Sequence, residues 1–297
     1  MKKTIVTGGA GFIGSNLVDA LVERGYETHV VDNLVSGKRA HVHPKAVFHE
    51  LDVRETEKLK ELFKGASCVF HLAALPRVQY SIEHPLETNE ANVTGTLSVL
   101  SAAKDAGVKR VVYAASSSAY GDQEELPLHE EMPAMPKSPY ALHKYVGELY
   151  ARLWSELFGL ETVSLRFFNV YGPRQSDEGA YALIIAKFLK QKRERKPLTV
   201  TGDGTQTRDF THVEDVVVAC LLAMESGKVG KGEVINIGSG KNISVNDIAR
   251  LVGGKVEHIA PRIEPHDTLA DTRRAKELLS WSPSVTIEEG IQSFLRQ

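Results

Sequence analysis

The sequence contains little cysteine and no long apolar run. Its two cysteines, Cys68 and Cys220, stand far apart in apolar surroundings, which argues against a disulfide framework and favours a reducing compartment. Glycines interrupt the apolar residues that follow Lys2 and Lys3, so the amino terminus lacks the apolar region of a signal peptide. No stretch approaches the roughly 20 apolar residues of a membrane span. We therefore expect no membrane partner and a cytoplasmic location.

The sequence also lacks an excess of charge of either sign. It contains 36 Lys and Arg against 38 Asp and Glu, which gives a formal net charge of −2 and no general attraction to nucleic acid. The basic run at residues 187–196 is interpreted as a solvated helix face. His41 and His43 have no further ligands beside them, so no metal site is predicted.

The chain does contain a regular alternation of short apolar segments and amphipathic segments. This order predicts an α/β fold with a doubly wound parallel sheet of the Rossmann type. After residue 169 the predicted strands shorten and the loops lengthen. We expect a Rossmann domain at 1–168, to which some later segments return, and a smaller C-terminal substrate-binding lobe at 169–297. The predicted strands are Lys3–Thr7, Glu27–Val31, Ala46–Leu51, Cys68–Leu72, Arg110–Ala115, Thr162–Phe167, Leu198–Thr201 and Val234–Ile237; after the first helix, at Ile13–Val22, the predicted helices are Glu57–Phe63, Val93–Ala106, Pro139–Phe158, Tyr181–Gln191, Val213–Glu225 and Val245–Leu251.

A glycine-rich stretch, VTGGAGFIG, separates the first predicted strand from the first predicted helix. Gly8 permits a tight turn, Gly11 lets the backbone approach a pyrophosphate, and Gly14 lets the helix pack on the strand. Asp32 closes the next predicted strand, where a carboxylate accepts hydrogen bonds from both hydroxyls of an adenosine ribose and repels a 2′-phosphate. The sequence therefore predicts a dinucleotide site that prefers NAD to NADP.

Three consecutive serines, 116–118, follow the predicted strand Arg110–Ala115. Adjacent hydroxyls at a strand end are consistent with turn chemistry, and also with the acid–base part of an active site. Tyr140 and Lys144 are spaced so that both lie on one face of a helix, with the ammonium beside the phenol. A cation in that position lowers the pKa of a phenol, ordinarily about 10, toward neutrality. The pair is therefore a candidate base with its helper.

These motifs occur in order together with HLAA (71–74), NVTGT (92–96), SSSAYGD (116–122), SPYALHK (138–144), RFFNVYGPRQ (166–175) and GDGTQTRDF (202–210). The chain resembles the extended short-chain dehydrogenases/reductases, and among them the NAD-dependent nucleotide-sugar epimerases of the UDP-glucose 4-epimerase type. The resemblance extends through LADTRRAKELLSWSP (269–283). It implies that Tyr140 is the catalytic base, that Lys144 supports it, and that Ser116 relays the proton.

Two positions narrow the activity that the resemblance implies. The 4,6-dehydratases carry acids at the positions of Ser117 and Ser118, and the UDP-glucuronate decarboxylases keep the second acid; a serine cannot replace either. The GDP-fucose synthases need a Cys and a His, and neither cysteine here lies in an active-site motif. We therefore expect C4 epimerisation of a UDP-sugar of the glucose/galactose type. A UDP-glucuronate epimerase and a 4-keto-sugar reductase are the alternatives within the enzymes, and a dinucleotide-sensing or docking protein is the non-enzymatic alternative.

The resemblance further implies a homodimer formed by the predicted helices Val93–Ala106 and Tyr140–Phe158. His71 ends a strand that we expect to be buried, which indicates a structural histidine near the cofactor. Thr268 occupies a gate position, where a small residue leaves room for an N-acetylated sugar. Arg77 either meets an acidic sugar or points to solvent, and Tyr80 is the second bulky residue of its loop. The implied NAD-binding residues are Gly8, Gly11, Phe12, Ile13, Gly14, Asp32, Asn33, Ser36, Gly37, Asp52, Val53, Leu72, Ala73, Ala74, Asn92, Tyr140, Lys144 and Phe168; the implied substrate-binding residues are Ser81, Ser116, Ser117, Tyr140, Asn169, Thr199, Val200, Thr201, Arg208, Arg262 and Thr268.

Overall fold

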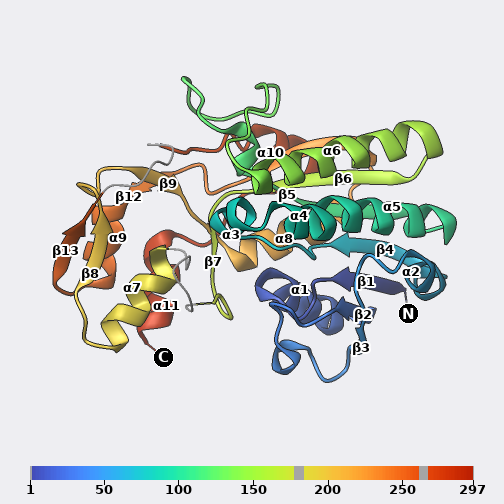
Figure 1. The fold of residues 1–297 in the computed structure, drawn as a ribbon, viewed down its shortest axis with the longest axis horizontal. Helices are drawn as coiled ribbons and strands as arrows, with labels where there is room; N and C mark the ends of the chain where they lie inside the picture. The colour runs from blue at the N-terminus through green and yellow to red at the C-terminus, as the bar shows by residue number, and fades with distance from the viewer. Residues whose placement is uncertain (1, 177–183, 261–266, 297) are drawn as a thin grey trace.

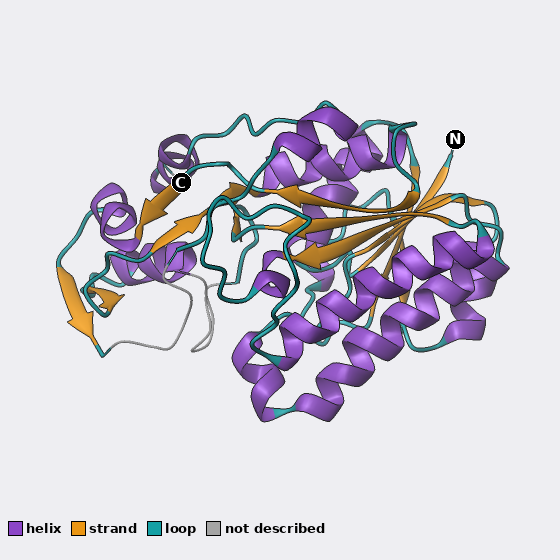
Figure 2. Cartoon of the chain, turned by 90° about the horizontal axis from the view of Figure 1, so that it is seen from above, coloured by secondary structure: helices purple, strands orange, loops and turns teal. Residues whose placement is uncertain are grey.

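A parallel sheet of seven strands forms the centre of the molecule in the computed structural model, which describes residues 2–176, 184–260 and 267–296. The strand order is β11-β6-β5-β4-β1-β2-β3, so the chain runs outward from β1 in both directions, as in a doubly wound Rossmann sheet. Figure 2 shows helices on both faces of this sheet. The strands are β1 (Lys3–Thr7), β2 (Glu27–Asp32), β3 (Val47–Glu50), β4 (Ala66–His71), β5 (Arg110–Ser116), β6 (Glu161–Phe167) and β11 (Lys231–Ile237).

Two apolar cores, one on each face, hold the helices to the sheet. On one face α1 (Phe12–Glu23) and α8 (Val213–Glu225) bury Leu17, Val216 and their neighbours against the strands. On the other face α2 (Thr56–Phe63) and α5 (Gly95–Asp105) bury a second cluster that includes Leu59 and Val99. The 20-residue helix α6 (Pro139–Phe158) packs beside α5, begins at the capping residue Ser138, and ends at the left-handed Gly159.

A smaller group of elements carries a third apolar core at the left of Figure 1. Here the strand β8 (Leu198–Thr201) pairs in parallel with β13 (Val256–Ile259). Three helices, α7 (Ile184–Arg193), α9 (Val245–Val252) and α11 (Ile287–Leu295), contribute the rest of this core. Two short pairs are separate from the seven-stranded sheet: β7 (Val170–Tyr171) with β10 (Thr211–His212), and β9 (Thr207–Asp209) with β12 (Asn242–Ser244).

All of the predicted strands and helices have a counterpart within the described residues; four have the predicted ends, and the ends of the others differ by at most three residues. The predicted helix Val93–Ala106 starts at Gly95, because residues Glu90–Thr94 form a π-helical turn that precedes it. Tyr181, in another predicted helix, lies outside the described residues. The helices α3 (Val78–Glu83), α4 (Pro85–Asn89) and α10 (Arg273–Leu279) were not predicted, since each is too short for a clear apolar period. The helix α11 was not predicted either. Among the described helices, none is long and apolar enough to cross a bilayer.

Candidate active site

The glycine turn after β1 leaves space and backbone donors for an anionic group. Gly8 adopts a φ of +71°, and a Cβ added to it would lie 2.7 Å from the backbone nitrogen of Ala73. A Cβ on Gly14 would overlap the carbonyl oxygen of Gly8, so helix α1 lies directly against the turn. Gly11 caps α1 without any side-chain hydrogen bond, which leaves the first amides of the helix open. This cradle fits a pyrophosphate at a helix amino terminus.

Asp32 at the end of β2 joins the glycine turn to the next loop. Its carboxylate accepts hydrogen bonds from the backbone nitrogens of Ala10 (3.0 Å) and Leu34 (2.9 Å). Burial raises the pKa of this carboxyl, and the two amide donors oppose that rise. A Cβ on Gly37 would lie 2.7 Å from Asp32 Oδ1, so the loop that includes Ser36 closes over the carboxylate. The predicted ribose acid is therefore fixed beside the cradle.

The neighbouring predicted residues Asn33 and Asp52 are hydrogen-bonded to each other at 3.0 Å. Asp52 also forms a two-point ion pair with Arg54, which holds the pKa of its carboxyl far below the usual range. Val53 packs against the start of α5, where a Cβ on Gly95 would lie 2.9 Å from its Cγ2. These residues form the outer edge of the site predicted for the adenosine.

His71 holds together the loops at the ends of β1 and β4. Thr96 donates its hydroxyl hydrogen to the carbonyl of Asn92 (2.6 Å), so it accepts from His71 Nε2 at 3.0 Å. His71 Nδ1 then accepts from the Thr7 hydroxyl at 2.8 Å, and burial lowers the pKa of this neutral imidazole to about 3. The structural role expected for His71 matches these contacts. The side chain of Asn92 in turn bonds both backbone groups of Leu75, and so fixes the predicted contact loop Leu72–Ala74.

Tyr140 and Lys144 lie on the first turns of α6, facing the end of β5. Lys144 is 4% exposed, and its Nζ donates to the carbonyl of Ala114 at 2.7 Å. Burial lowers the pKa of Lys144 to about 8, while Glu148 acts in the opposite direction. Burial raises the pKa of the Tyr140 phenol, and a hydrogen bond with the side chain of Ser116 opposes that rise. The three residues predicted for catalysis are thus brought together.

Among the three serines, Ser116 is the one that contacts Tyr140. Its Oγ accepts from the backbone nitrogen of Ser118 (3.2 Å) and lies 2.8 Å from the Ser118 hydroxyl. Ser117 begins the single 3₁₀ turn that follows β5. The turn interpretation of the serine run is therefore confirmed, and the same turn includes the hydroxyl that contacts Tyr140. The acid–base role of Ser116 stays a prediction.

Ser81 is predicted to bind substrate, but its side chain is fully buried. Its Oγ donates to the carbonyl of Val78 (2.6 Å) and accepts from the backbone nitrogen of Tyr140 at 3.0 Å. The hydroxyl therefore satisfies a free amide in the first turn of α6. In this structure Ser81 supports the backbone of Tyr140, and a direct contact of Ser81 with substrate stays a prediction.

Three predicted substrate residues meet around Asp209, which is fully buried. Asn169 donates from Nδ2 to the carbonyl of Asp209 at 2.9 Å, and Thr268 Oγ1 accepts from the Asp209 nitrogen at 3.3 Å. Arg208 precedes Asp209 on β9. Arg262 lies outside the described residues. The carboxylate of Asp209 itself accepts from Ser239 N and Oγ (both 2.6 Å), Gly240 N (3.0 Å) and Ala270 N (3.0 Å).

The segment predicted beside the uracil forms β8. Val200 is fully buried in the third core, and Thr199 bonds the side chain of Gln191 through both its nitrogen and its hydroxyl. Phe168, predicted at the cofactor, is also fully buried, in a small cluster with Tyr120. Contacts of Val200 and Phe168 with ligands therefore have to come from their backbone groups.

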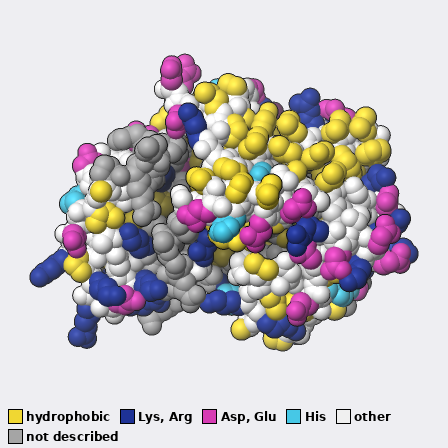
Figure 3. All heavy atoms as spheres, viewed as in Figure 1, with side chains coloured by type: hydrophobic (Ala, Val, Ile, Leu, Met, Phe, Trp, Pro, Cys, Tyr) yellow, Lys and Arg dark blue, Asp and Glu magenta, His cyan; other side chains and the backbone are white. Residues whose placement is uncertain are grey.

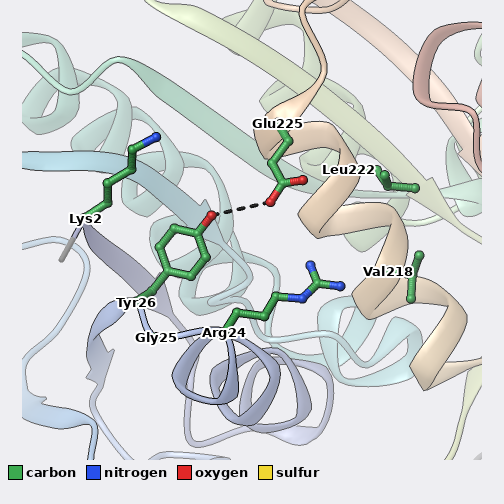
Figure 4. A pocket seen from close by; sticks show the side chains of 7 residues that line it. All are labelled: Lys2, Arg24, Gly25, Tyr26, Val218, Leu222 and Glu225. Carbon is green, nitrogen blue, oxygen red and sulfur yellow. Dashed lines mark hydrogen bonds between the residues drawn. The ribbon is translucent and has the colours of Figure 1, made fainter.

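Two shallow cavities lie away from all of these residues. The first, of about 460 Å³, opens at the amino ends of the strands, where Tyr26 donates to Glu225 at 3.4 Å beside Lys2 and Arg24 (Figure 4). The second, of about 370 Å³, lies between α1 and α8. Substrates of open parallel sheets bind at the carboxyl ends of the strands, so neither cavity is the expected site. The described residues contain no cluster of side chains that could hold a metal ion.

Comparison with known proteins matches residues 4–238 to the NAD dependent epimerase/dehydratase family. The chain belongs to this family. A UDP-glucuronate 4-epimerase of Thermodesulfobacterium geofontis is 38% identical over 309 residues, covering 97% of this chain and 93% of the relative. The UDP-glucose 4-epimerase of Thermotoga maritima, solved with UDP-glucose, superposes with a TM-score of 0.94 at 36% identity, covering 99% and 98% of the chains. The Thermus thermophilus UDP-glucose 4-epimerase, solved with NAD, gives a TM-score of 0.91 at 33% identity, covering 99% and 98%.

The family membership confirms the predicted fold, the resemblance and the predicted NAD. The roles of the individual site residues stay predictions. Two contributors were missed at the sequence level, Glu148 behind Lys144 and Asp209 beside Arg208. Both lie in or next to motifs that the sequence analysis used: Glu148 is one helical turn after Lys144, and Asp209 belongs to the GDGTQTRDF motif. Neither gave a signal, since only burial distinguishes them from exposed acids.

Proposed function

We propose that this NAD-dependent family member is an isomerase that inverts C4 of a UDP-hexose of the glucose/galactose type. The observation that carries the proposal is the meeting of Ser116, Tyr140 and Lys144 at the end of β5, at the same edge of the sheet as the pyrophosphate cradle. Serines at 117 and 118, in place of the acids that an elimination requires, favour oxidation and re-reduction at one carbon. The related enzymes named above act on the same class of compound.

In the proposed reaction NAD, when bound, accepts a hydride from a carbinol carbon and returns it. Tyr140 takes the proton of the sugar 4-hydroxyl as that carbon is oxidised, and Ser116 orients the hydroxyl. Lys144 stabilises the phenolate because its buried ammonium lies on the same helix face. The 4-keto sugar then presents its other face, and Tyr140 returns the proton to the oxygen at C4.

Binding of the nucleotide sugar is assigned to the second region. Arg208 and Asn169 supply donors for the diphosphate, a planar guanidinium being well suited to phosphate oxygens. The boundary between the two functional regions is proposed near residue 168, although α8 and β11 return to the first.

We also propose that the chain acts in the cytoplasm as a homodimer. Leu142, Leu149 and Leu153 on α6 are 48%, 47% and 40% exposed and lie on one helix face. Figure 3 shows hydrophobic side chains gathered over the region of α5 and α6. A two-fold contact between these helices in two copies would cover this surface. Light scattering should give twice the chain mass at micromolar concentration, and Leu149→Glu should give monomers.

Purified protein tests the activity directly. We expect NAD to be released on denaturation of the protein as isolated, and UDP-glucose and UDP-galactose to interconvert. Stoichiometric NADP in its place would show that Asp32 has been misread. Interconversion of neither sugar, with NAD present, would reject the proposed substrate.

A UDP-glucuronate epimerase is the second candidate, favoured by one observation. Arg77, at the start of α3, is only partly exposed, and its guanidinium has no hydrogen-bond or ion-pair partner among the described residues. Its helix also carries Ser81, which contacts Tyr140. Turnover of UDP-glucuronate in preference to UDP-glucose, lost selectively in Arg77→Ala, would support this candidate.

A further inference from the structure

Behind the catalytic pair lies a buried ion pair. Glu148 follows Lys144 by one helical turn on the same face of α6 and is 2% exposed. Its two oxygens accept from Nε and Nη2 of Arg166 on β6, at 2.9 Å and 2.7 Å. Arg166 is 3% exposed, and its guanidinium carbon lies 4.5 Å from the ring centre of Tyr120. The carboxylate is thus held by two points, with an aromatic ring behind the guanidinium.

Stability alone does not explain this ion pair. Removing two charges from water is expensive, and replacing buried ion pairs by apolar residues of similar size is often neutral or stabilising. In addition, the buried Nη1 of Arg166 has no hydrogen-bond partner among the described residues. A buried donor without a partner carries a further cost. The location beside Lys144 points instead to a role in the chemistry.

Glu148 lies between two cations without neutralising the catalytic one. The Lys144 ammonium donates to the carbonyl of Ala114, while both Glu148 oxygens are occupied by Arg166. The three charges therefore leave one net positive charge beside the Tyr140 phenol. A phenolate that forms at Tyr140 gains from this charge, and a free Glu148 that paired with Lys144 would remove that gain.

The other titratable groups around Lys144 do not change this charge near neutral pH. Tyr113 on β5, whose ring centre lies 5.0 Å from Lys144 Nζ, has a pKa raised by burial. His71 on β4 has a pKa of about 3 and is neutral. His143, next to Lys144 on α6, has a pKa lowered by burial. Tyr120, beside Arg166, has a pKa raised to about 12. Burial raises the pKa of the Glu148 carboxyl, and the hydrogen bonds and charge of Arg166 and the charge of Lys144 oppose that rise. Lys144, Glu148 and Arg166 are then the charged members of the cluster.

We propose that Glu148 and Arg166 are positioning residues that set the charge behind Tyr140 and Lys144 and keep the Glu148 carboxylate from pairing with the lysine. The inference rests on the function proposed above, in which Tyr140 is the base. Glu148 favours the charged form of the buried Lys144 ammonium. The two-point contact with Arg166 keeps the Glu148 carboxylate from pairing with this ammonium, which can then stabilise the Tyr140 phenolate.

Opposite charge changes should move the pH dependence of kcat in opposite directions. Glu148→Gln removes a negative charge, so both Tyr140 and Lys144 lose their protons more readily, and the whole bell-shaped profile shifts to lower pH by about one unit or more. Arg166→Met removes a positive charge and shifts the profile to higher pH. Glu148→Asp, which keeps the charge, should leave the profile in place.

Glu156→Gln is the matched control, because Glu156 lies on the same helix in an exposed pair with Arg152 at 2.9 Å. It should leave the profile unchanged. Loss of activity without a shift in Glu148→Gln or Arg166→Met, or shifts of the same sign in both, would overturn the proposal. Either variant alone tests it if the other fails to fold.

A second measurement needs no sugar. The ultraviolet difference spectrum of the phenolate in the protein as purified, with the spectrum of Tyr140→Phe subtracted, gives the Tyr140 titration directly. This titration should shift by the same sign as the activity profile in each variant. If the chain does not epimerise UDP-hexoses but the titrations shift as expected, the proposed function fails and the positioning role stands; unshifted titrations in an active enzyme reject the positioning role.

Discussion

The two halves of the candidate site are built in different ways. On the cofactor side, the functional positions lie at the ends of neighbouring strands of one sheet, and the register of β1, β2 and β4 places Gly8, Asp32 and Leu72 side by side. On the sugar-nucleotide side, Asn169, Arg208 and Thr268 come from separate loops and short strands, and the buried residue Asp209 connects them.

This difference shows where each half is vulnerable. The geometry of the cofactor side is fixed by many backbone hydrogen bonds between strands. A single side-chain substitution there removes one contact and leaves this geometry in place. On the other side a single carboxylate accepts four hydrogen bonds from Ser239, Gly240 and Ala270. We expect substitutions there to alter substrate binding while leaving NAD binding intact.

Tyr140→Phe should have the largest effect on turnover, because the cofactor and the sugar nucleotide are both bound for a reaction at this residue. Loss of the acid–base group should lower kcat by about 10³-fold or more, whereas NAD content and UDP-sugar affinity should stay near those of the unchanged protein. Kinetics combined with calorimetric titration of UDP checks this. An equal loss of binding and turnover would mean that the phenol has a structural role.

Asp209→Asn should separate the two halves. The amide keeps the size but offers an NH₂ group to backbone donors, so at least one buried donor loses its partner at a cost of about 1–3 kcal/mol. We expect KM for the UDP-sugar to rise by roughly 5- to 100-fold with the bound NAD unchanged. Loss of NAD together with substrate binding would show that the halves are not independent. Asp203→Asn, on the exposed turn before β9, is the control.

The cofactor half could be predicted from the sequence because its determinants are local. Gly8 and Gly14 are required by close backbone contacts, and the strand and helix periods around them are regular. Helical spacing made Tyr140 and Lys144 a candidate pair, and the family resemblance supplied their expected roles. The charge cluster behind them did not, because Arg166 reaches Glu148 only when β6 packs under α6.

The short strands and side-chain contacts of the sugar-nucleotide half could not be predicted from the sequence, because they too depend on tertiary packing. The strands β9, β10 and β12 have two or three residues each, too few to show a period, and β9 and β12 pair across residues distant in sequence. Ser81 was predicted from the family resemblance in a stretch expected to be a loop, yet that stretch forms a helix and its hydroxyl accepts from the Tyr140 amide. Tertiary contacts decided both cases.

Asp32→Asn is the counterpart on the cofactor side and should have a smaller effect than Asp209→Asn. The side chain loses its charge, and its new NH₂ group has to face one of the two backbone amides of Ala10 and Leu34 that bond the carboxylate. NAD affinity should therefore fall by about tenfold, as the charge-assisted hydrogen bonding to the ribose weakens. Discrimination against NADP should decrease as well, because the repulsion of a 2′-phosphate is removed. Titration of both dinucleotides into protein stripped of cofactor measures this; unchanged preference would contradict the ribose role.

The smallest effect is expected at Thr268, and it concerns specificity. Thr268 is half-buried beside β9, and its Oγ1 accepts the hydrogen bond of Asp209 N, so the side chain both borders the site and supports it. If the small residue leaves the pocket open, kcat/KM for UDP-GalNAc should lie within a hundredfold of that for UDP-Gal. Thr268→Tyr should then lower the UDP-GalNAc value by about tenfold more than the UDP-Gal value, the cost of one overfilled contact.

Thr268→Val separates space from hydrogen bonding in that test, because valine keeps the shape of threonine and removes the hydroxyl. If the size of residue 268 sets the preference, the ratio of kcat/KM for UDP-GalNAc to that for UDP-Gal should be the same in Thr268→Val as in the unchanged protein. Both kcat/KM values should fall equally, because Asp209 loses the hydrogen bond to the hydroxyl. If Thr268→Val instead reproduces the selectivity of Thr268→Tyr, the hydroxyl and not the volume sets the preference. If the unchanged protein rejects UDP-GalNAc by more than a hundredfold, another residue closes the pocket, and the bulky Arg77 and Tyr80 are the next positions to shorten.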